Sequence, residues 1–133
     1  MKSVINSSVY NYINLLNSAA NATYVRHEVI LNNMANVSTP KFKRSDIKFE
    51  DYLKNQLAKT SGNLDQKVAN VDLGKLKATV YVDQSELSYR LDGNNVDIDI
   101  EEAHLAENQI RYYTLLDSIT QEFSRRKMVL SKN

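Results

Sequence analysis

The fold class is decided by residues 5–37, INSSVYNYINLLNSAANATYVRHEVILNNMANV. Apolar and small side chains recur in this stretch in steps of three and four, the period of one face of an α-helix. These positions are Ile5, Val9, Tyr12, Leu16, Ala20, Thr23, His27, Ile30, Met34 and Val37. Because Pro40 disfavours helical geometry in the residue before it, we expect this helix to end near Asn36.

A second stripe with the same period runs through residues 98–133. Its members are Ala103, Ala106, Ile110, Tyr113, Leu116, Thr120, Phe123, Lys127 and Leu130, with Leu105, Tyr112, Leu115 and Ile119 beside them. Asp99 and Glu102 have the spacing of a capping box at the start of this helix. Both stripes keep close to heptad spacing, which predicts that the two terminal helices pair as a coiled coil. The predicted seam contains Ile5, Val9, Leu16, Ile30, Met34, Ala106, Ile110, Tyr113, Leu116 and Phe123.

The middle of the chain has a less regular pattern. Residues 47–58 have the pattern of a short amphipathic helix, and the polar residues 59–75 are expected to be mobile. Two β-rich runs, 79–82 and 87–91, flank a turn at 83–86 and predict a small β-hairpin. We therefore expect a mainly α protein in three parts: an N-terminal helix (1–38), an elbow and middle region (39–97) and a C-terminal helix (98–133).

Composition favours an elongated protein that is buried among neighbours. The 133 residues include only three Gly and one Pro, as expected for a chain with few, long elements. A helix of about 33 residues spans roughly 50 Å, more than the ~30 Å diameter of a small domain, so both termini should lie at one end of a long molecule. Residues 1–40 carry only three charged side chains, Lys2, Arg26 and Glu28, but eight Asn, which suggests close packing in an assembly.

The same sequence argues against catalysis, a cofactor and a metal site. The absence of Cys excludes disulfides, thiolate zinc sites and a cysteine nucleophile. His27 and His104 lack partners at metal-ligand spacing, and the acidic run after Asp92 fails the ligand register of a calcium loop. The adjacent side chains of Glu101 and Glu102 would point apart on a helix. No apolar run is long enough to span a membrane, and polar residues interrupt any cleavable signal at the N-terminus.

Two other function classes remain as alternatives. A cytoplasmic coiled-coil adaptor or chaperone would also have two long helices. A small nucleic-acid-binding protein could use Lys41, Lys43 and Arg44, which are interleaved with Phe42. The net charge of only +1 gives the second alternative little support.

Two stretches of the chain resemble the axial proteins of the bacterial flagellum. Residues 32–43, NNMANVSTPKFK, resemble the signature at the end of the first helix in that family. Residues 90–99, RLDGNNVDID, with 105–112, LAENQIRY, are similar to the proximal rod proteins of the family. The family usually has Gly where this chain has Lys41, so Lys41 would be strained if that position requires a positive φ. The matching residues are Asn32, Asn33, Asn36, Thr39, Pro40, Phe42 and Lys43 in the first stretch, and Asp92, Gly93, Asn94, Asn95, Val96, Asp97, Asn108 and Gln109 in the second.

The resemblance implies a structural subunit of the flagellar rod, which assembles with itself and with other rod proteins to transmit torque for motility. The two helices would form an inner coiled-coil layer and the middle region an outer layer. The segment 36–44 would be an elbow that fixes the tilt of the subunit. The resemblance also implies export by the flagellar type III apparatus without a cleaved signal peptide, and MS-ring or export-gate components as neighbours at the base of the rod.

Overall fold

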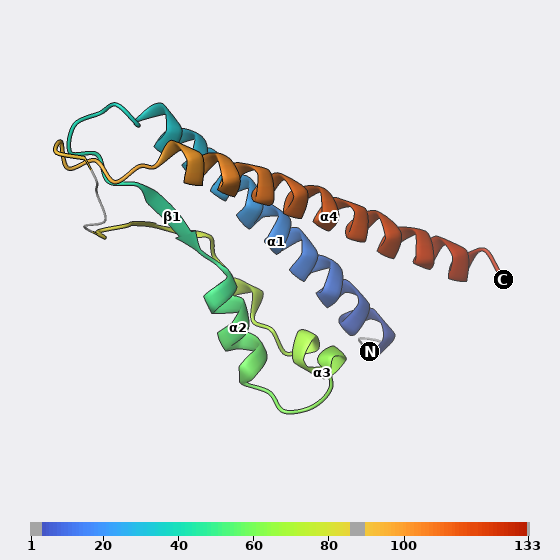
Figure 1. The fold of residues 1–133 in the computed structure, drawn as a ribbon. Coiled ribbons are helices and arrows are strands. Elements are labelled where there is room, and N and C mark those ends of the chain that lie inside the picture. Colours follow the sequence, from blue (N-terminus) through green and yellow to red (C-terminus); the bar gives the residue numbers. More distant parts are fainter. Residues whose placement is uncertain (1–3, 86–89, 133) are drawn as a thin grey trace.

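Two long helices dominate the computed structural model, which describes residues 4–85 and 90–132, with side chains from residue 10 onward. Helix α1 comprises Val4–Ala35 and helix α4 comprises Ile98–Leu130. They run antiparallel and side by side, and the start of α1 and the end of α4 lie at the same end of an elongated molecule (Figure 1). The prediction of a mainly α protein with long, paired terminal helices is confirmed.

Helix α4 begins two residues earlier than the capping box predicted. Its N-cap is Asp97, whose backbone is extended and whose side chain accepts hydrogen bonds from the backbone N–H groups of Asp99 and Ile100, at 3.0 and 3.3 Å. Asp99 therefore lies in the first turn, where the helix dipole favours a carboxylate. The predicted partner Glu102 is exposed.

The middle region contains a two-stranded antiparallel sheet, as expected. The predicted strand 79–82 is confirmed as β2, but its partner is not the predicted run 87–91. Strand β1, Ser45–Lys48, pairs with strand β2, Thr79–Val82, with Ser45 opposite Val82 and Lys48 opposite Thr79. The predicted strand 87–91 lies largely outside the described residues, and its last two residues form a bend and a turn. Helix α2, Glu50–Ala58, begins only after β1, so residue 47 belongs to a strand rather than to the predicted helix.

Residues 59–75 contain short helices, which the sequence pattern did not predict. Helix α3 comprises Leu64–Ala69, and a 3₁₀ turn, η1, comprises Leu73–Lys75. Asn63 and Gln66 form a capping box at the start of α3, which satisfies backbone N–H groups in an otherwise polar segment. Val68 is buried and fixes α3 to the rest of the molecule.

The main hydrophobic core lies between α1 and the middle region. Three residues of α1 contribute at intervals of seven, which places them on one face of the helix. The core consists of Leu15, Ala22, Val29, Ile47, Phe49, Val68 and Leu76. Helix α1 therefore has two partners, because a different face of it packs against α4.

The face of α4 that contacts α1 differs from the predicted seam. Glu101 and Asn108 hydrogen-bond to α1, and the guanidinium of Arg126 lies 4.7 Å from the centre of the Tyr10 ring. The partly buried residues between them follow the same heptad spacing: Leu105, Tyr112, Leu115 and Ile119. The predicted seam residues Ala106, Ile110, Tyr113, Leu116 and Phe123 are exposed instead.

The predicted seam of α4 is wrong because the face that contacts α1 is partly polar. Helix α4 carries two neighbouring stripes of heptad spacing, and the stripe against α1 includes a Glu and an Asn, so hydrophobicity alone pointed to the other stripe. On α1, Leu16 and Ile30 are buried and Met34 is half-buried. The side chains of Ile5 and Val9 lie outside the described part of the chain.

Candidate functional site

The two stretches that resemble axial proteins meet at the end of α1. The Asn94 side chain is fully buried, and its Nδ2 donates hydrogen bonds to the backbone carbonyls of Asn36 (2.9 Å), Val37 (3.1 Å) and Thr39 (2.8 Å). These carbonyls belong to the turn that follows α1, so Asn94 holds that turn in place from a distant part of the sequence. The N–H of Val96 donates to Asn94 Oδ1 at 2.7 Å and holds the amide in this orientation.

Backbone contacts extend this meeting point along the elbow. The N–H of Lys41 donates to the carbonyl of Asp92 at 2.8 Å, and the N–H of Asn95 donates to the carbonyl of Phe42 at 3.3 Å. The N–H of Arg44 donates to Asn95 Oδ1 at 2.7 Å. We call residues 33–45 and 90–101, which these bonds connect, the joint.

Two residues of the joint have positive φ angles. Lys41 has φ +61° and Gly93 has φ +76°. Only Gly adopts this left-handed conformation without strain, and for other L-residues it costs roughly 1–2 kcal/mol. The sequence raised the question of strain at Lys41, and the structure places Lys41 in the strained conformation.

A fully buried carboxylate, that of Glu101, lies at the centre of the joint. Glu101 Oε1 accepts a hydrogen bond from Arg44 Nε at 2.6 Å, and Oε2 accepts one from Asn33 Nδ2 at 3.3 Å. Asn33, also fully buried, donates to the carbonyl of Ser45 at 2.8 Å and accepts from the Ser45 N–H at 2.9 Å. Helix α1, strand β1 and the first turn of α4 are therefore connected through these side chains.

The positive charge at this centre belongs to Arg44. Burial lowers the pKa of its guanidinium, but the hydrogen bond and charge of Glu101 outweigh burial and raise the pKa overall. Arg44 Nη1 also lies 3.2 Å from Asp83, and Nη2 lies 3.6 Å from Asp46. This ion pair holds its partners in one geometry, because removing Arg44 would leave the buried carboxylate of Glu101 without its cationic partner.

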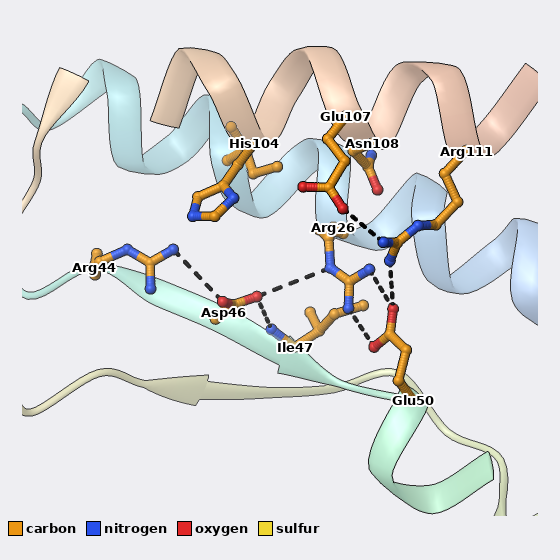
Figure 2. Close-up of a pocket in the computed structure, with 10 residues that line it drawn as sticks. Arg26, Arg44, Asp46, Ile47, Glu50, His104, Glu107, Asn108 and Arg111 are labelled. Carbon is orange, nitrogen blue, oxygen red and sulfur yellow. Dashed lines mark hydrogen bonds and ion pairs between the residues drawn. The ribbon is translucent and has the colours of Figure 1, made fainter. Parts of the chain in front are cut away.

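A second set of ion pairs connects the middle region to both long helices (Figure 2). At the start of α2, Glu50 accepts two hydrogen bonds from Arg26 of α1, both 2.6 Å, and one of 2.8 Å from Arg111 of α4. Arg111 also donates to Glu107 at 2.7 Å. Hydrogen bonding from Arg26 lowers the pKa of the Glu50 carboxyl, against the opposing effect of its partial burial.

These ion pairs line an open cavity of about 330 Å³ between the middle region and α4. Each arginine in it faces at least one carboxylate, so the charges are balanced internally (Figure 2). Within residues 4–85 and 90–132, no three His, Cys, Asp or Glu side chains are grouped so that they could hold a metal ion. None of the helices in the same part of the chain is long and apolar enough to cross a membrane.

Comparison with known proteins connects this geometry to a family. No family model matches the chain. It is 30% identical over 130 residues to the flagellar basal body rod protein FlgB of Bacillus subtilis (strain 168), with 97% of each chain covered. The chain belongs to the FlgB family of flagellar basal body rod proteins. It is also similar to the FlgB proteins of Aquifex aeolicus (strain VF5; 32% identity, covering 81% of this chain and 83% of the relative) and Borrelia hermsii (40% identity, covering 66% and 72%).

A member of the FlgB family is a structural subunit of the flagellar rod, so this chain is a structural protein of the basal body that serves motility. The FlgB relationship does not favour the adaptor, chaperone or nucleic-acid-binding alternatives. A structural role agrees with the geometry of the site, in which polar side chains pair with one another through hydrogen bonds and ion pairs.

The joint of this FlgB-family chain contains most, but not all, of the residues that the two sequence stretches suggested. Asn33, Asn36, Thr39, Phe42, Asp92, Gly93, Asn94 and Asn95 come together there. Asn32 lies just outside the joint and is exposed. Within it, Pro40 is exposed, Lys43 is half-buried, Val96 is buried and Asp97 caps α4. Farther along α4, Asn108 is buried and donates to the Thr23 carbonyl at 2.8 Å, whereas Gln109 is exposed.

Sequence reasoning missed the charged residues that hold the joint and the middle region. The sequence places Arg44 in a basic cluster at the end of the elbow, and Glu101 in an acidic run beside Glu102, but it does not predict that the two side chains pair. A usable signal for Arg44 was its position directly after the first stretch. No local pattern connects Arg26, Glu50 and Arg111, because they are far apart in the sequence.

Proposed function

We propose that the joint fixes the middle region rigidly against the paired helices, so that a rotating rod does not lose torque in bending its subunits. The observation that carries this proposal is the buried Asn94 amide, which donates to three backbone carbonyls of the turn that follows α1. Satisfied, buried polar contacts specify one geometry, because any displacement would expose unpaired groups at a cost of about 1–3 kcal/mol each.

Rigidity is supported by a second contact away from the elbow. Glu50 connects the start of α2 to Arg26 and Arg111, on different long helices. The hydrophobic core also holds the middle region against α1. A body held at two separate points resists rotation about either of them.

The chain would work in three parts, with residues 1–38 and 98–133 in an inner layer and residues 39–97 on the outside. Its partners would be other copies, other rod subunits and, at the base of the rod, components of the MS ring or export gate. Export through the flagellar type III apparatus without a cleaved signal would bring it there. The family name supports the rod location, while these finer assignments are our inference.

Neither catalysis nor nucleic-acid binding forms part of this proposal. Arg44 of the basic cluster is paired with Glu101 and Asp83 and so is not presented to a phosphate. The grouped carboxylates and arginines neutralise one another. The functional surface is therefore one for contacts with other subunits.

The proposal is tested by an in-frame deletion of the gene in its source bacterium, complemented by the intact gene. We expect the deletion strain to lack rods, hooks, filaments and swimming, and the intact gene to restore them. A deletion strain that still builds hooks and filaments and swims would overturn the rod function. A soluble cytoplasmic oligomer that is never exported would instead indicate the adaptor or chaperone class.

A further inference from the structure

Helix α1 has a third face. Apart from Tyr10 at its start, whose ring lies 4.7 Å from the guanidinium of Arg126 of α4, neither α4 nor the middle region covers it. Its residues follow strict heptad spacing, in alternating steps of four and three, and all are exposed. We call this face the free α1 stripe: Tyr10, Asn14, Asn17, Asn21, Tyr24, Glu28 and Leu31. Tyr10, Tyr24 and Leu31 are 51%, 56% and 44% exposed, so the stripe presents apolar area as well as amides.

Helix α4 carries the corresponding uncovered face beside its contact with α1. We call it the free α4 stripe: Ala106, Ile110, Tyr113, Leu116, Thr120 and Phe123. Ile110, Tyr113, Leu116 and Phe123 are 70%, 62%, 38% and 55% exposed. Apolar side chains at this spacing along several turns are typical of a helix that packs against another helix.

The two free stripes match each other in charge and spacing. The free α1 stripe has one charged residue, Glu28, and the free α4 stripe has none. Exposed helix faces of soluble proteins are normally charged, and large exposed apolar faces usually mark an interaction surface. Asn and Tyr side chains can donate and accept hydrogen bonds at such a contact while their neighbours bury apolar area.

We propose that the free α1 stripe of one copy packs against the free α4 stripe of the next copy. This inference rests on the proposed rod function and names the surfaces through which copies meet. The contact joins two different faces, so each copy keeps one face of each kind available for a further neighbour. Contacts of this heterologous type generate rings or open helical arrays.

A symmetric contact between two α4 stripes would explain the observations less well. It would bury the apolar side chains of α4 but leave the nearly uncharged α1 stripe, with Tyr10 and Tyr24, in water. Pairing α1 with α4 covers both faces at once. It also preserves the antiparallel direction of these helices when neighbouring copies point the same way.

Disulfide cross-linking tests the proposal without background, because the chain contains no Cys. Two copies are expressed together in the deletion strain: one carries Leu116→Cys, and the other carries an affinity tag and Asn17→Cys, Asn21→Cys or Tyr24→Cys. Rods are isolated and oxidised. A disulfide requires Cα atoms about 4.4–6.8 Å apart, so it reports direct helix contact. The matched control replaces the α1 variant with the exposed middle-region change Leu64→Cys.

We expect a covalent dimer of twice the chain mass when Leu116→Cys is combined with at least one α1 variant, and none with Leu64→Cys. A dimer from Leu116→Cys alone would show that two α4 stripes meet, and would overturn the proposal. Complete rods without a cross-link to any of the three α1 positions would also overturn it while leaving the rod function intact. Three α1 positions are included so that one variant that fails to assemble does not decide the result.

Discussion

Arg44 Nε and Glu101 Oε1 lie 2.6 Å apart, and this ion pair joins the end of the elbow to the first turn of α4. Asn33 of α1 donates to the other oxygen of the same carboxylate. Three segments that are distant in the sequence thus depend on one fully buried side chain. The geometry of the joint should therefore be sensitive to small changes at this position.

Replacing Glu101 with Ala should lower the free energy of unfolding by about 3 kcal/mol, because Arg44 would lose its closest partner inside the protein. Asp83 and Asp46 remain near Arg44, which limits the loss. Urea unfolding of the purified chain, followed by circular dichroism, measures the change. The matched control, Glu102→Ala, alters the exposed neighbouring residue and should change stability by less than about 0.5 kcal/mol. Equal losses in the two variants would contradict the role assigned to Glu101.

Replacing Lys41 with Gly should raise the free energy of unfolding by about 1 kcal/mol, because Gly accepts the positive φ of this position without strain. Lys43 provides the control, since its φ is not positive. There the same change adds only backbone freedom to the unfolded chain, so Lys43→Gly should be neutral or destabilising. Thermal unfolding shows whether each variant is more or less stable than the intact chain. A loss of stability in Lys41→Gly would show that no strain is relieved.

The Glu50 ion pairs should make stability depend on pH. The hydrogen bond from Arg26 lowers the pKa of Glu50 in the folded chain. Glu50 therefore contributes stability above the pKa of an unfolded glutamate, about 4.3, and that contribution is lost as the pH falls through the lower folded pKa. We expect Glu50→Gln to be less stable than the intact chain at pH 7, and the difference in stability to shrink as the pH falls below about 4.3.

Unfolding free energies at several pH values between 3 and 7 measure this convergence. Because Glu50 is half-exposed, the difference at pH 7 should be modest, about 1 kcal/mol or less. Asp51→Asn is the matched control, since Asp51 has no ion pair among the described residues. If the difference in unfolding free energy between Glu50→Gln and the intact chain stays constant down to pH 3, the stabilising role of the Glu50 ion pairs is contradicted.

Local patterns predicted the long helices well. Steps of three and four located α1 and α4, and Pro40 located the end of α1 to within one residue of Ala35. The choice between the two stripes of α4 failed, because its contact with α1 uses Glu101 and Asn108. Polar residues are buried only where other segments supply hydrogen-bond partners, and the spacing of residues within one helix does not predict those partners.

Long-range pairing accounts for the remaining differences. Strand β1 has only four residues, and its partner β2 follows after two intervening helices and a 3₁₀ turn, so neighbouring runs were paired instead. The resemblance identified Asn94 and Asn36 as residues of interest but not their contact. The acceptors of Asn94 are backbone carbonyls, which every residue possesses and no sequence pattern distinguishes.

The central claim, that the joint is required for a functional rod subunit, is tested most directly by counting complete rods in a strain that carries Asn94→Asp. This change keeps the size of the side chain but replaces the donor with a carboxylate that faces three carbonyls. Asn55→Asp, the same change at an exposed position of α2, is the control, and immunoblots establish equal amounts of both chains. We predict that electron microscopy of basal bodies finds few or no complete rods with Asn94→Asp and normal numbers with Asn55→Asp. Normal numbers of complete rods with Asn94→Asp would contradict the account.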